Sequence, residues 1–222
     1  EDMFAGCENL VDIKLSNEVI TIKSQAFMNC KNLEVLVVPD SLNSVGAWAF
    51  EGCSSLRGFK KNLCCSSDLC FDKYLIINNM LCFAAPAEIG ENLLVTGVAQ
   101  IAKRAFSECG RLKKVEIGGD VCQIGDYAFY GCTSLKSVTV GESLQKIQSN
   151  AFYGCSSLGE FVYLGVSTDW QGITKSSNWR DGALFTDVKC SDKIIGVNDP
   201  LNPVAMETGD GFLYVIMPIR KK

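Results

Sequence analysis

Large apolar, small and polar residues follow one another in the same order six times along this chain. Residues 151–158 read AFYGCSSL, and near copies stand at 3–10, 26–33, 49–56, 105–112 and 128–135. Within each group of three copies, successive phenylalanines are 23 residues apart. A fixed period of roughly 20 to 29 residues predicts a solenoid of the leucine-rich type, in which each unit forms one coil.

The unit LEVLVVPDSLNSVGAWAF, residues 33–50, indicates how one coil is expected to fold. Leu33, Leu36 and Val38 alternate with outward positions, which predicts a short strand with one buried face. Pro39 is expected to end this strand, because it has no N–H group to donate to the ladder. Gly46 is expected to permit a tight turn before the next phrase begins.

Stacking explains why the phrase returns at a fixed interval. A single coil of this length cannot cover its own apolar side, whereas stacked coils cover one another. Equivalent residues then lie above one another at about 4.8 Å, the spacing of neighbouring strands. We therefore predict interior columns of phenylalanine, cysteine and leucine, made of Phe27, Cys30, Leu33, Phe50, Cys53, Leu56, Phe106, Cys109, Leu112, Phe129, Cys132, Leu135, Phe152, Cys155 and Leu158.

The repeat phrase [I/V]-G-x-x-A-F-x-x-C-x-x-L-x-x-[I/V]-x-[L/V]-P resembles that of the BspA-like (Treponema pallidum-type) leucine-rich repeat family. Six phrases in phase cover residues 3–59 and 93–164, although Met3 replaces the alanine of the first. The resemblance implies an α/β repeat solenoid, a right-handed coil that is mostly β with short turns or helical segments. It also implies a secreted or surface-anchored adhesion protein of a bacterium or a parasitic protist.

The two groups of phrases are separated by an insert at residues 60–92. Within it, the segments 74–77 and 80–83 flank Asn78-Asn79, which predicts a β-hairpin because asparagine tolerates the positive φ of a two-residue turn. The hairpin is expected either to pad the stack or to project as a recognition element. The solenoid as a whole is expected to span residues 1–164.

The period stops after Leu164, and residues 165–195 are expected to form a C-terminal cap. Thr168-x-x-Gln171 is a capping-box pattern that predicts a short helix over residues 169–173. Trp170 and Trp179 are expected to cover the open end of the last coil, with ligand stacking as the alternative role. Residues 196–222 form a tail without an assigned role, in which FLYVIMPI (212–219) is strand-like and expected to pair with the cap or to begin a further domain.

Composition narrows the classes of function. The net charge of −4 and the pI of about 5.0 argue against nucleic acid as a partner, because phosphate binding requires a concentrated basic surface. No apolar run approaches the roughly 20 residues that span a bilayer. The chain has no histidine, which removes the commonest general base and every histidine-containing metal site. We therefore expect no enzyme and no cofactor.

Twelve cysteines divide into those in phase with the repeat and those outside it. The six in phase are expected to be buried, reduced thiols, because they recur with the core residues. Cys122 lies within a coil and Cys190 within the cap. Cys64, Cys65, Cys70 and Cys82 form the one local cluster; they are read as unpaired thiols, as one disulfide, or as a metal site, although their spacing suits zinc poorly.

The outward positions of the strands differ from coil to coil while the interior positions do not. Such variation on a regular scaffold indicates a binding surface on the concave side, with ordinary solvated residues as the alternative. Lys113, Lys114 and Lys136 form a small basic spot, with Arg111 nearby, which suits at most a local acidic partner. The candidate binding residues are Asp12, Lys14, Glu34, Val37, Lys113, Glu116, Lys136 and Thr139.

Three hypotheses of function follow. The first is a surface or secreted module that binds a host protein, a cell or a glycan through the solenoid face, and the second is a structural spacer of a larger surface protein. The third is a thiol or zinc site at the cysteine cluster of residues 64–82. The chain begins within a repeat phrase and lacks the features of a signal peptide, so we expect a trimmed or mature fragment. The family resemblance implies an extracellular or cell-surface location, and a monomer is favoured.

Overall fold

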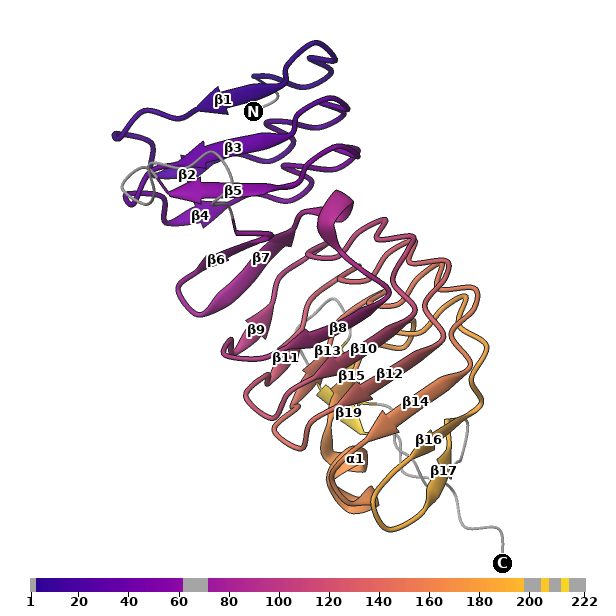
Figure 1. The fold of residues 1–222 in the computed structure, drawn as a ribbon. Coiled ribbons are helices and arrows are strands. Elements are labelled where there is room, and N and C mark those ends of the chain that lie inside the picture. Colours follow the sequence, from indigo (N-terminus) through magenta and orange to yellow (C-terminus); the bar gives the residue numbers. More distant parts are fainter. Residues whose placement is uncertain (1–2, 62–71, 198–204, 208–212, 216–222) are drawn as a thin grey trace, which may run out of the picture.

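The computed structural model describes residues 3–61, 72–197, 205–207 and 213–215, and it is a β-solenoid of stacked coils (Figure 1). The predicted leucine-rich repeat coil is therefore confirmed. Helix is scarce: the described residues hold a six-residue helix and one 3-10 turn. The stack consists of two blocks, each with its own pair of sheets and its own apolar core. Pairing is parallel except at one edge of each sheet of the second block, where β17 pairs antiparallel with β16 and β6 with β7.

The first block contains five strands within residues 3–61. One parallel sheet has the order β1-β3-β5, and the other pairs β2 with β4. Their bounds are β1 (Asp12–Lys14), β2 (Thr21–Ile22), β3 (Val35–Val38), β4 (Ser44–Val45) and β5 (Gly58–Lys61). Pro39 directly follows β3, as its missing N–H group predicts.

The second block contains a long-strand sheet in the order β17-β16-β14-β12-β10-β8 and a short-strand sheet that ends in β9, β7 and β6 (Figure 1). The long strands are β8 (Asn92–Val95), β10 (Lys114–Ile117), β12 (Ser137–Val140), β14 (Glu160–Tyr163), β16 (Asp187–Lys189) and β17 (Ile194–Gly196). The short strands are β9 (Gln100–Ile101), β11 (Gln123–Ile124), β13 (Lys146–Ile147) and β15 (Thr174–Lys175).

The phenylalanine column is present in both blocks. The rings of Phe106 and Phe129 lie 5.0 Å apart at 4°, and those of Phe129 and Phe152 lie 5.2 Å apart at 3°. Phe4 and Phe27 stack in the same way in the first block, at 5.2 Å and 6°. Each ring covers the next, so the column buries large apolar surfaces that one coil alone would leave in water.

The cysteine column links neighbouring coils by hydrogen bonds. The thiol of Cys132 donates to the carbonyl oxygen of Phe106 in the preceding coil at 3.1 Å, and that of Cys155 donates to Phe129 at 3.1 Å. Cys53 makes the equivalent bond in the first block, to Phe27 at 3.0 Å. Each of these repeat cysteines is therefore a small apolar side chain that packs in the core and also a weak donor to the preceding coil.

Gly46 has a different role from the one that its sequence context predicts. The residues with positive φ are Trp48 (58°) and Gly52 (74°), and Gly46 is not among them. A Cβ atom on Gly46 would lie 2.3 Å from the backbone nitrogen of Ser24 in the preceding coil. The glycine is thus required by the close approach of two coils, and not by a left-handed turn.

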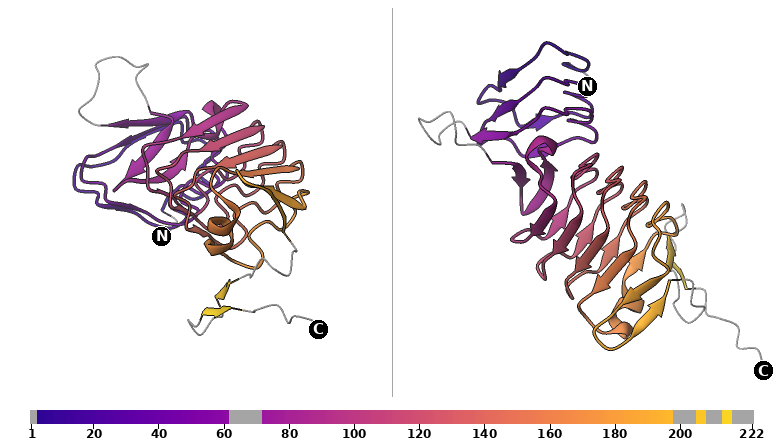
Figure 2. Two further views of the ribbon diagram at one scale, coloured as in Figure 1. Left: turned by 90° about the horizontal axis from the view of Figure 1, so that it is seen from below. Right: turned by 45° about the vertical axis from the view of Figure 1, so that its right-hand side comes forward.

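The predicted hairpin is present between the blocks, where β6 (Tyr74–Ile77) pairs antiparallel with β7 (Met80–Ala84). Asn78 (φ 50°) and Asn79 (φ 61°) form its turn, as expected. The strand β7 also pairs in parallel with β9, so the hairpin ends the short-strand sheet of the second block. We call residues 74–88, which comprise the hairpin and the 3-10 turn η1 (Pro86–Glu88), the joint. Figure 2 shows the joint between the two blocks.

The hairpin contributes to both apolar cores. Leu81 and Ala84 belong to the core of the second block, whereas Cys82 and Phe83 belong to that of the first. Phe83 lies 5.2 Å from Phe50, centroid to centroid. The insert therefore packs as part of the stack and closes the first block against the second.

The cap contains α1 (Ser167–Gly172), which begins two residues before the predicted start. The predicted capping box is wrong, because the helix is preceded by Val166 and has no side-chain cap. The carboxylate of Asp192 instead accepts from the Ser167 N–H and hydroxyl, both at 2.7 Å. Trp170 is buried against the rings of Phe161 and Trp179, so both predicted tryptophans lie in the cap core.

In the tail, β18 (Ala205–Glu207) pairs antiparallel with β19 (Leu213–Val215), which lies within the strand-like FLYVIMPI segment. The strand β19 thus takes its partner from the tail itself. Cys64, Cys65 and Cys70 lie outside the described residues, as does most of the tail. No helix in the described part of the chain is long and apolar enough to cross a membrane.

Candidate functional site

The solvent-facing side of the long strands, which we call the strand face, carries the variable positions. Parallel pairing aligns Lys114 with Ser137 and Glu160, and it aligns Glu116 with Thr139. Because the register is fixed by the buried residues between them, these side chains form straight rows across the sheet. The strand face therefore presents side chains of unlike chemistry at regular spacing.

The predicted binding residues occupy two positions relative to this face. Some lie on the strands, with the outward side chain exposed or half-buried: Asp12, Lys14, Val37, Glu116 and Thr139. The others are exposed and directly precede a strand, at the edge where the turn enters the sheet: Glu34, Lys113 and Lys136. The first four in chain order belong to the first block and the last four to the second, so the structure brings them together as two groups.

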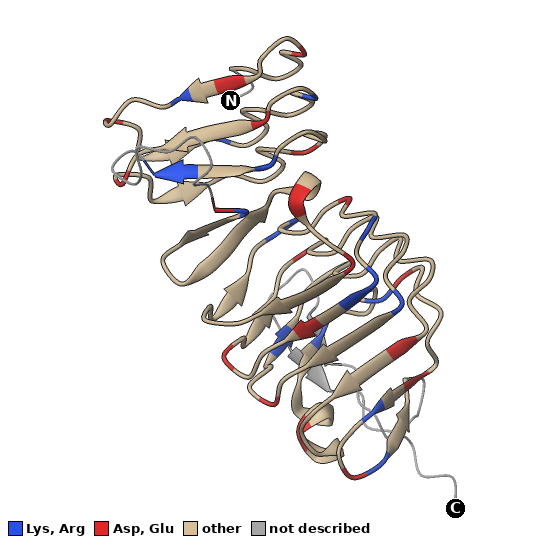
Figure 3. Ribbon diagram, in the orientation of Figure 1, with Lys and Arg blue, Asp and Glu red and all other residues tan. Residues whose placement is uncertain are grey.

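The basic spot is largely neutralised by neighbouring carboxylates. Lys113 lies 2.5 Å from Glu91, and Lys114 lies 2.6 Å from Glu116 on the same strand. The hydrogen bond and the charge of Lys113 lower the pKa of Glu91, with smaller effects of nearby basic residues. Figure 3 shows acidic and basic residues interspersed along the second block. The strand face thus lacks the concentrated positive charge that would favour an acidic partner.

Leu94 on β8 is a surface residue that sequence reasoning missed. It is 61% exposed and lies in the same row as Glu116. Val162 lies further along this row and is half-buried. The alternation within residues 92–95 could have identified Leu94 as outward-facing.

A second surface, the aromatic edge, lies on the turns of the coils and was also missed. The guanidinium of Arg104 lies 4.5 Å from the ring centroid of Tyr130 and 5.6 Å from that of Trp48 across the joint. Tyr130 stacks on Tyr153 at 5.9 Å and 5°, and Tyr153 is 46% exposed. Trp48 and Arg104 lie two residues before a repeat phenylalanine, and Tyr130 and Tyr153 lie one residue after one. Comparison of the six phrases at these two positions could have identified this surface.

Five of the six repeat thiols have the properties of core residues, whereas Cys7 is exposed, contrary to the expectation that all six are buried. Burial raises the pKa of Cys53 and of Cys109 to about 12, with a smaller effect of neighbouring groups. Cys82 from the cluster is a buried free thiol whose pKa burial raises to about 11. Within residues 3–61 and 72–197, no group of three acidic or cysteine side chains could hold a metal ion. A thiol that stays protonated is a poor nucleophile and a poor metal ligand.

The stacked coils, the strand face and the cap define a leucine-rich repeat solenoid. A family model for the BspA type leucine rich repeat region, with six copies, matches residues 1–96 and 79–170. The chain belongs to the BspA-type leucine-rich repeat family.

Solved structures with a similar fold include three bacterial proteins. A leucine rich cell surface protein from Faecalibacterium prausnitzii is 17% identical, with a TM-score of 0.41, over 78% of this chain and 65% of that one. A T. pallidum leucine rich repeat protein is 21% identical (TM-score 0.45; 68% and 69%), and the pneumococcal vaccine antigen PcpA is 16% identical (TM-score 0.42; 82% and 68%). The chain thus spans less than two thirds of the first protein. A comparison with curated proteins gave no significant match.

Proposed function

We propose that this chain is a non-catalytic binding module of a secreted or cell-surface protein, and that it contacts a host protein, a cell or a glycan through the strand face. The observation that carries the proposal is the contrast between the two sides of each long strand. The inward side repeats aliphatic residues, whereas the outward side changes from Lys114 to Ser137 to Glu160 along one row. A rigid scaffold that varies only its outward residues suits recognition.

The chemistry of the strand face favours a partner of mixed polarity. The lysines at positions 113 and 114 are already paired with carboxylates, and such exposed pairs contribute little to a long-range field. Leu94 and Val162 add aliphatic surface to the row that contains Thr139. Binding would therefore depend on shape, hydrogen bonds and apolar contact, and only weakly on ionic strength.

Two variants and a matched control test this proposal. Leu94→Arg and Thr139→Arg place a long cation in the row, whereas Gln145→Arg places the same side chain in the exposed turn before β13. The purified chain and the variants would be titrated against an array of matrix proteins and glycans, with circular dichroism to verify folding. Saturable binding that both strand-face variants lose and Gln145→Arg keeps supports the proposal.

Binding that all three variants retain equally would contradict recognition through the strand face. Absence of binding by the unmodified chain would favour the alternative function, a structural spacer within a larger surface protein. We also propose an extracellular or cell-surface location. We propose in addition that the chain is a monomer, and sedimentation of the purified chain would test this oligomeric state. The family assignment and the raised pKa values of the buried thiols both favour a non-catalytic role.

A further inference from the structure

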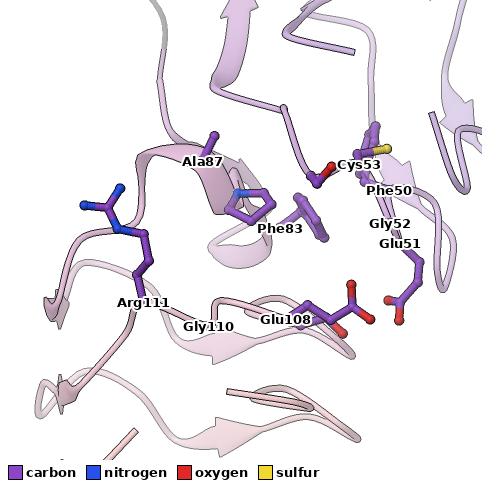
Figure 4. A pocket seen from close by; sticks show the side chains of 12 residues that line it. Phe50, Glu51, Gly52, Cys53, Phe83, Ala87, Glu108, Gly110 and Arg111 are labelled. Atoms are coloured by element: carbon purple, nitrogen blue, oxygen red, sulfur yellow. The ribbon is translucent and has the colours of Figure 1, made fainter. Parts of the chain in front are cut away.

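A pocket of about 310 Å³ opens at the joint, between the two blocks (Figure 4). Three segments line it: residues 50–54 from the first block, Phe83, Pro86 and Ala87 from the joint, and Ser107, Glu108, Gly110 and Arg111 from the second block. Phe50 and Phe83 form an apolar side. Its volume is at the lower end of ordinary ligand pockets, which is enough for a few side chains of a peptide.

Backbone hydrogen bonds between coils follow a fixed pattern elsewhere in the solenoid. The N–H of each repeat phenylalanine donates to a carbonyl of the next coil: Phe27 to Ala49, Phe106 to Ala128 and Phe129 to Ala151, each at 2.8 Å. The N–H two residues later donates in the same way, as from Asn29 to the carbonyl of Glu51 at 2.7 Å. These bonds hold each turn against its neighbour.

The pattern is broken at the joint. Among the described residues, no acceptor pairs with the N–H groups of Phe50 and Gly52, which are the equivalent donors of the last coil of the first block. The carbonyl of Ser107, equivalent to that of Glu51, likewise receives no donor in the described part of the chain. All three residues line the pocket, so an incomplete ladder of two donors and one acceptor borders it.

The guanidinium of Arg104 compensates only in part for two carboxylates that line this pocket, those of Glu51 and Glu108. Glu51 Oε1 accepts from Arg104 at 2.6 Å, but Glu51 Oε2 is buried without a hydrogen-bond partner. Desolvation, followed by the charge of Glu51, raises the pKa of Glu108. Figure 4 shows the carboxylates of Glu51 and Glu108 on one side of the pocket and Arg111 extending on the other. A cation placed between the two carboxylates would offset their repulsion and their desolvation.

We propose that the joint pocket binds a short extended peptide segment that carries a lysine or arginine side chain. The peptide carbonyls accept from the N–H groups of Phe50 and Gly52, and a peptide N–H donates to the carbonyl of Ser107. The cationic side chain extends its aliphatic part over Phe83 and its head toward the two carboxylates. This mode is the addition of backbone to an incomplete ladder, and it is independent of the strand-face proposal.

The test follows the backbone amide signals of the full, ¹⁵N-labelled chain during titration. The probe is acetyl-Ala-Lys-Ala-amide, and its counterpart with norleucine in place of lysine removes only the cation. Glu108→Gln neutralises one pocket carboxylate, and Ala87→Trp fills the pocket. Glu142→Gln is the matched control, because it neutralises an exposed carboxylate in the turn after β12, outside both proposed binding surfaces.

We expect saturable shifts of the Phe50 and Gly52 amide signals with the lysine peptide. The affinity should fall at least tenfold with the norleucine peptide and with Glu108→Gln, should vanish with Ala87→Trp, and should be unchanged with Glu142→Gln. Equal affinity for the two peptides would overturn the proposal, as would shifts confined to residues outside the pocket. Failure of the strand-face variants to alter array binding would leave this titration unaffected, so the two proposals fail separately.

Discussion

The Nη1 atom of Arg104 lies 2.6 Å from the Oε1 atom of Glu51, and this ion pair joins the two blocks across the joint. The two side chains are only 14% and 13% exposed, so little water screens the pair. The partners are 53 residues apart in the chain. The contact is therefore a determinant of how the blocks are held together.

Loss of the arginine charge should destabilise the joint. Arg104→Met leaves the buried Glu51 carboxylate without its cation, which we expect to cost about 3 kcal/mol of unfolding free energy. Adding Glu51→Met should recover most of this loss. Denaturant unfolding measures both. The control is Lys31→Met, which breaks an exposed ion pair with Glu8 and should cost under ~1 kcal/mol of unfolding free energy. If Arg104→Met cost no more than this control, the prediction would be contradicted.

The buried repeat thiols should resist alkylation in the native chain. Burial raises the pKa of Cys53 and Cys109 to about 12, so almost no thiolate forms near neutral pH. Cys7 is exposed and should react with iodoacetamide within minutes. Mass spectrometry of timed samples at pH 8, with and without denaturant, compares the sites. Alkylation of Cys132 as fast as that of Cys7 under native conditions would refute the burial argument.

Lys175 should make the cap more stable at high pH than at neutral pH. Burial lowers its pKa from 10.5 to about 8, although its ammonium donates to the carbonyls of Trp170 and Ile173. The folded state thus binds fewer protons than the unfolded state between pH 8 and 10.5. This group therefore opposes folding below pH 8, and the opposition fades as the pH rises through that window.

The measurement for Lys175 is a difference, because tyrosine and cysteine side chains also titrate in this range. The free energy of unfolding of the unmodified chain is compared with that of Lys175→Met at pH 7, 8.5 and 10. As the pH rises, the free energy of unfolding of the unmodified chain should increase relative to that of the variant, by up to about 3 kcal/mol. A constant difference across the three pH values would show that Lys175 has an ordinary pKa.

Substitutions at the two asparagines of the hairpin turn should affect the stability of the chain differently. Asn78→Ala loses a residue suited to positive φ and a hydrogen bond to Asn43 Oδ1 at 2.6 Å, so it should cost about 1 kcal/mol. Asn79→Gly should be neutral or stabilising, because glycine adopts positive φ readily. Thermal unfolding of both variants decides; a loss with Asn79→Gly as large as that with Asn78→Ala would contradict the turn geometry.

Close contact between coils makes Gly141 intolerant of a side chain. A Cβ atom there would lie 2.6 Å from the Cα of Gly119, which is backbone and cannot turn aside. Gly141→Ala should therefore cost roughly 1–3 kcal/mol. Gly172→Ala is the matched control, since its Cβ would meet no heavy atom within 4 Å. Denaturant midpoints of the two variants should differ clearly, and coinciding midpoints would argue against such tight stacking.

Local sequence patterns determined the solenoid, its interior columns and the β-hairpin. Each of these depends on residues within one unit or one turn, such as the 23-residue spacing of the phenylalanines and the Asn78-Asn79 pair. The capping box failed for the opposite reason. Thr168 and Gln171 are local, but the carboxylate that serves the helix belongs to Asp192, 25 residues after Ser167.

Only the tertiary structure decided what happens where the period is broken. The insert places β7 beside β9 and sets Arg104 against Glu51. Within the described part of the chain, it also leaves the N–H groups of Phe50 and Gly52 without the carbonyls that their equivalents contact. No local pattern encodes these relationships, because they depend on how far the hairpin displaces one stack from the next. The sequence therefore determined each coil, and long-range packing determined the surfaces and the pocket that the coils form together.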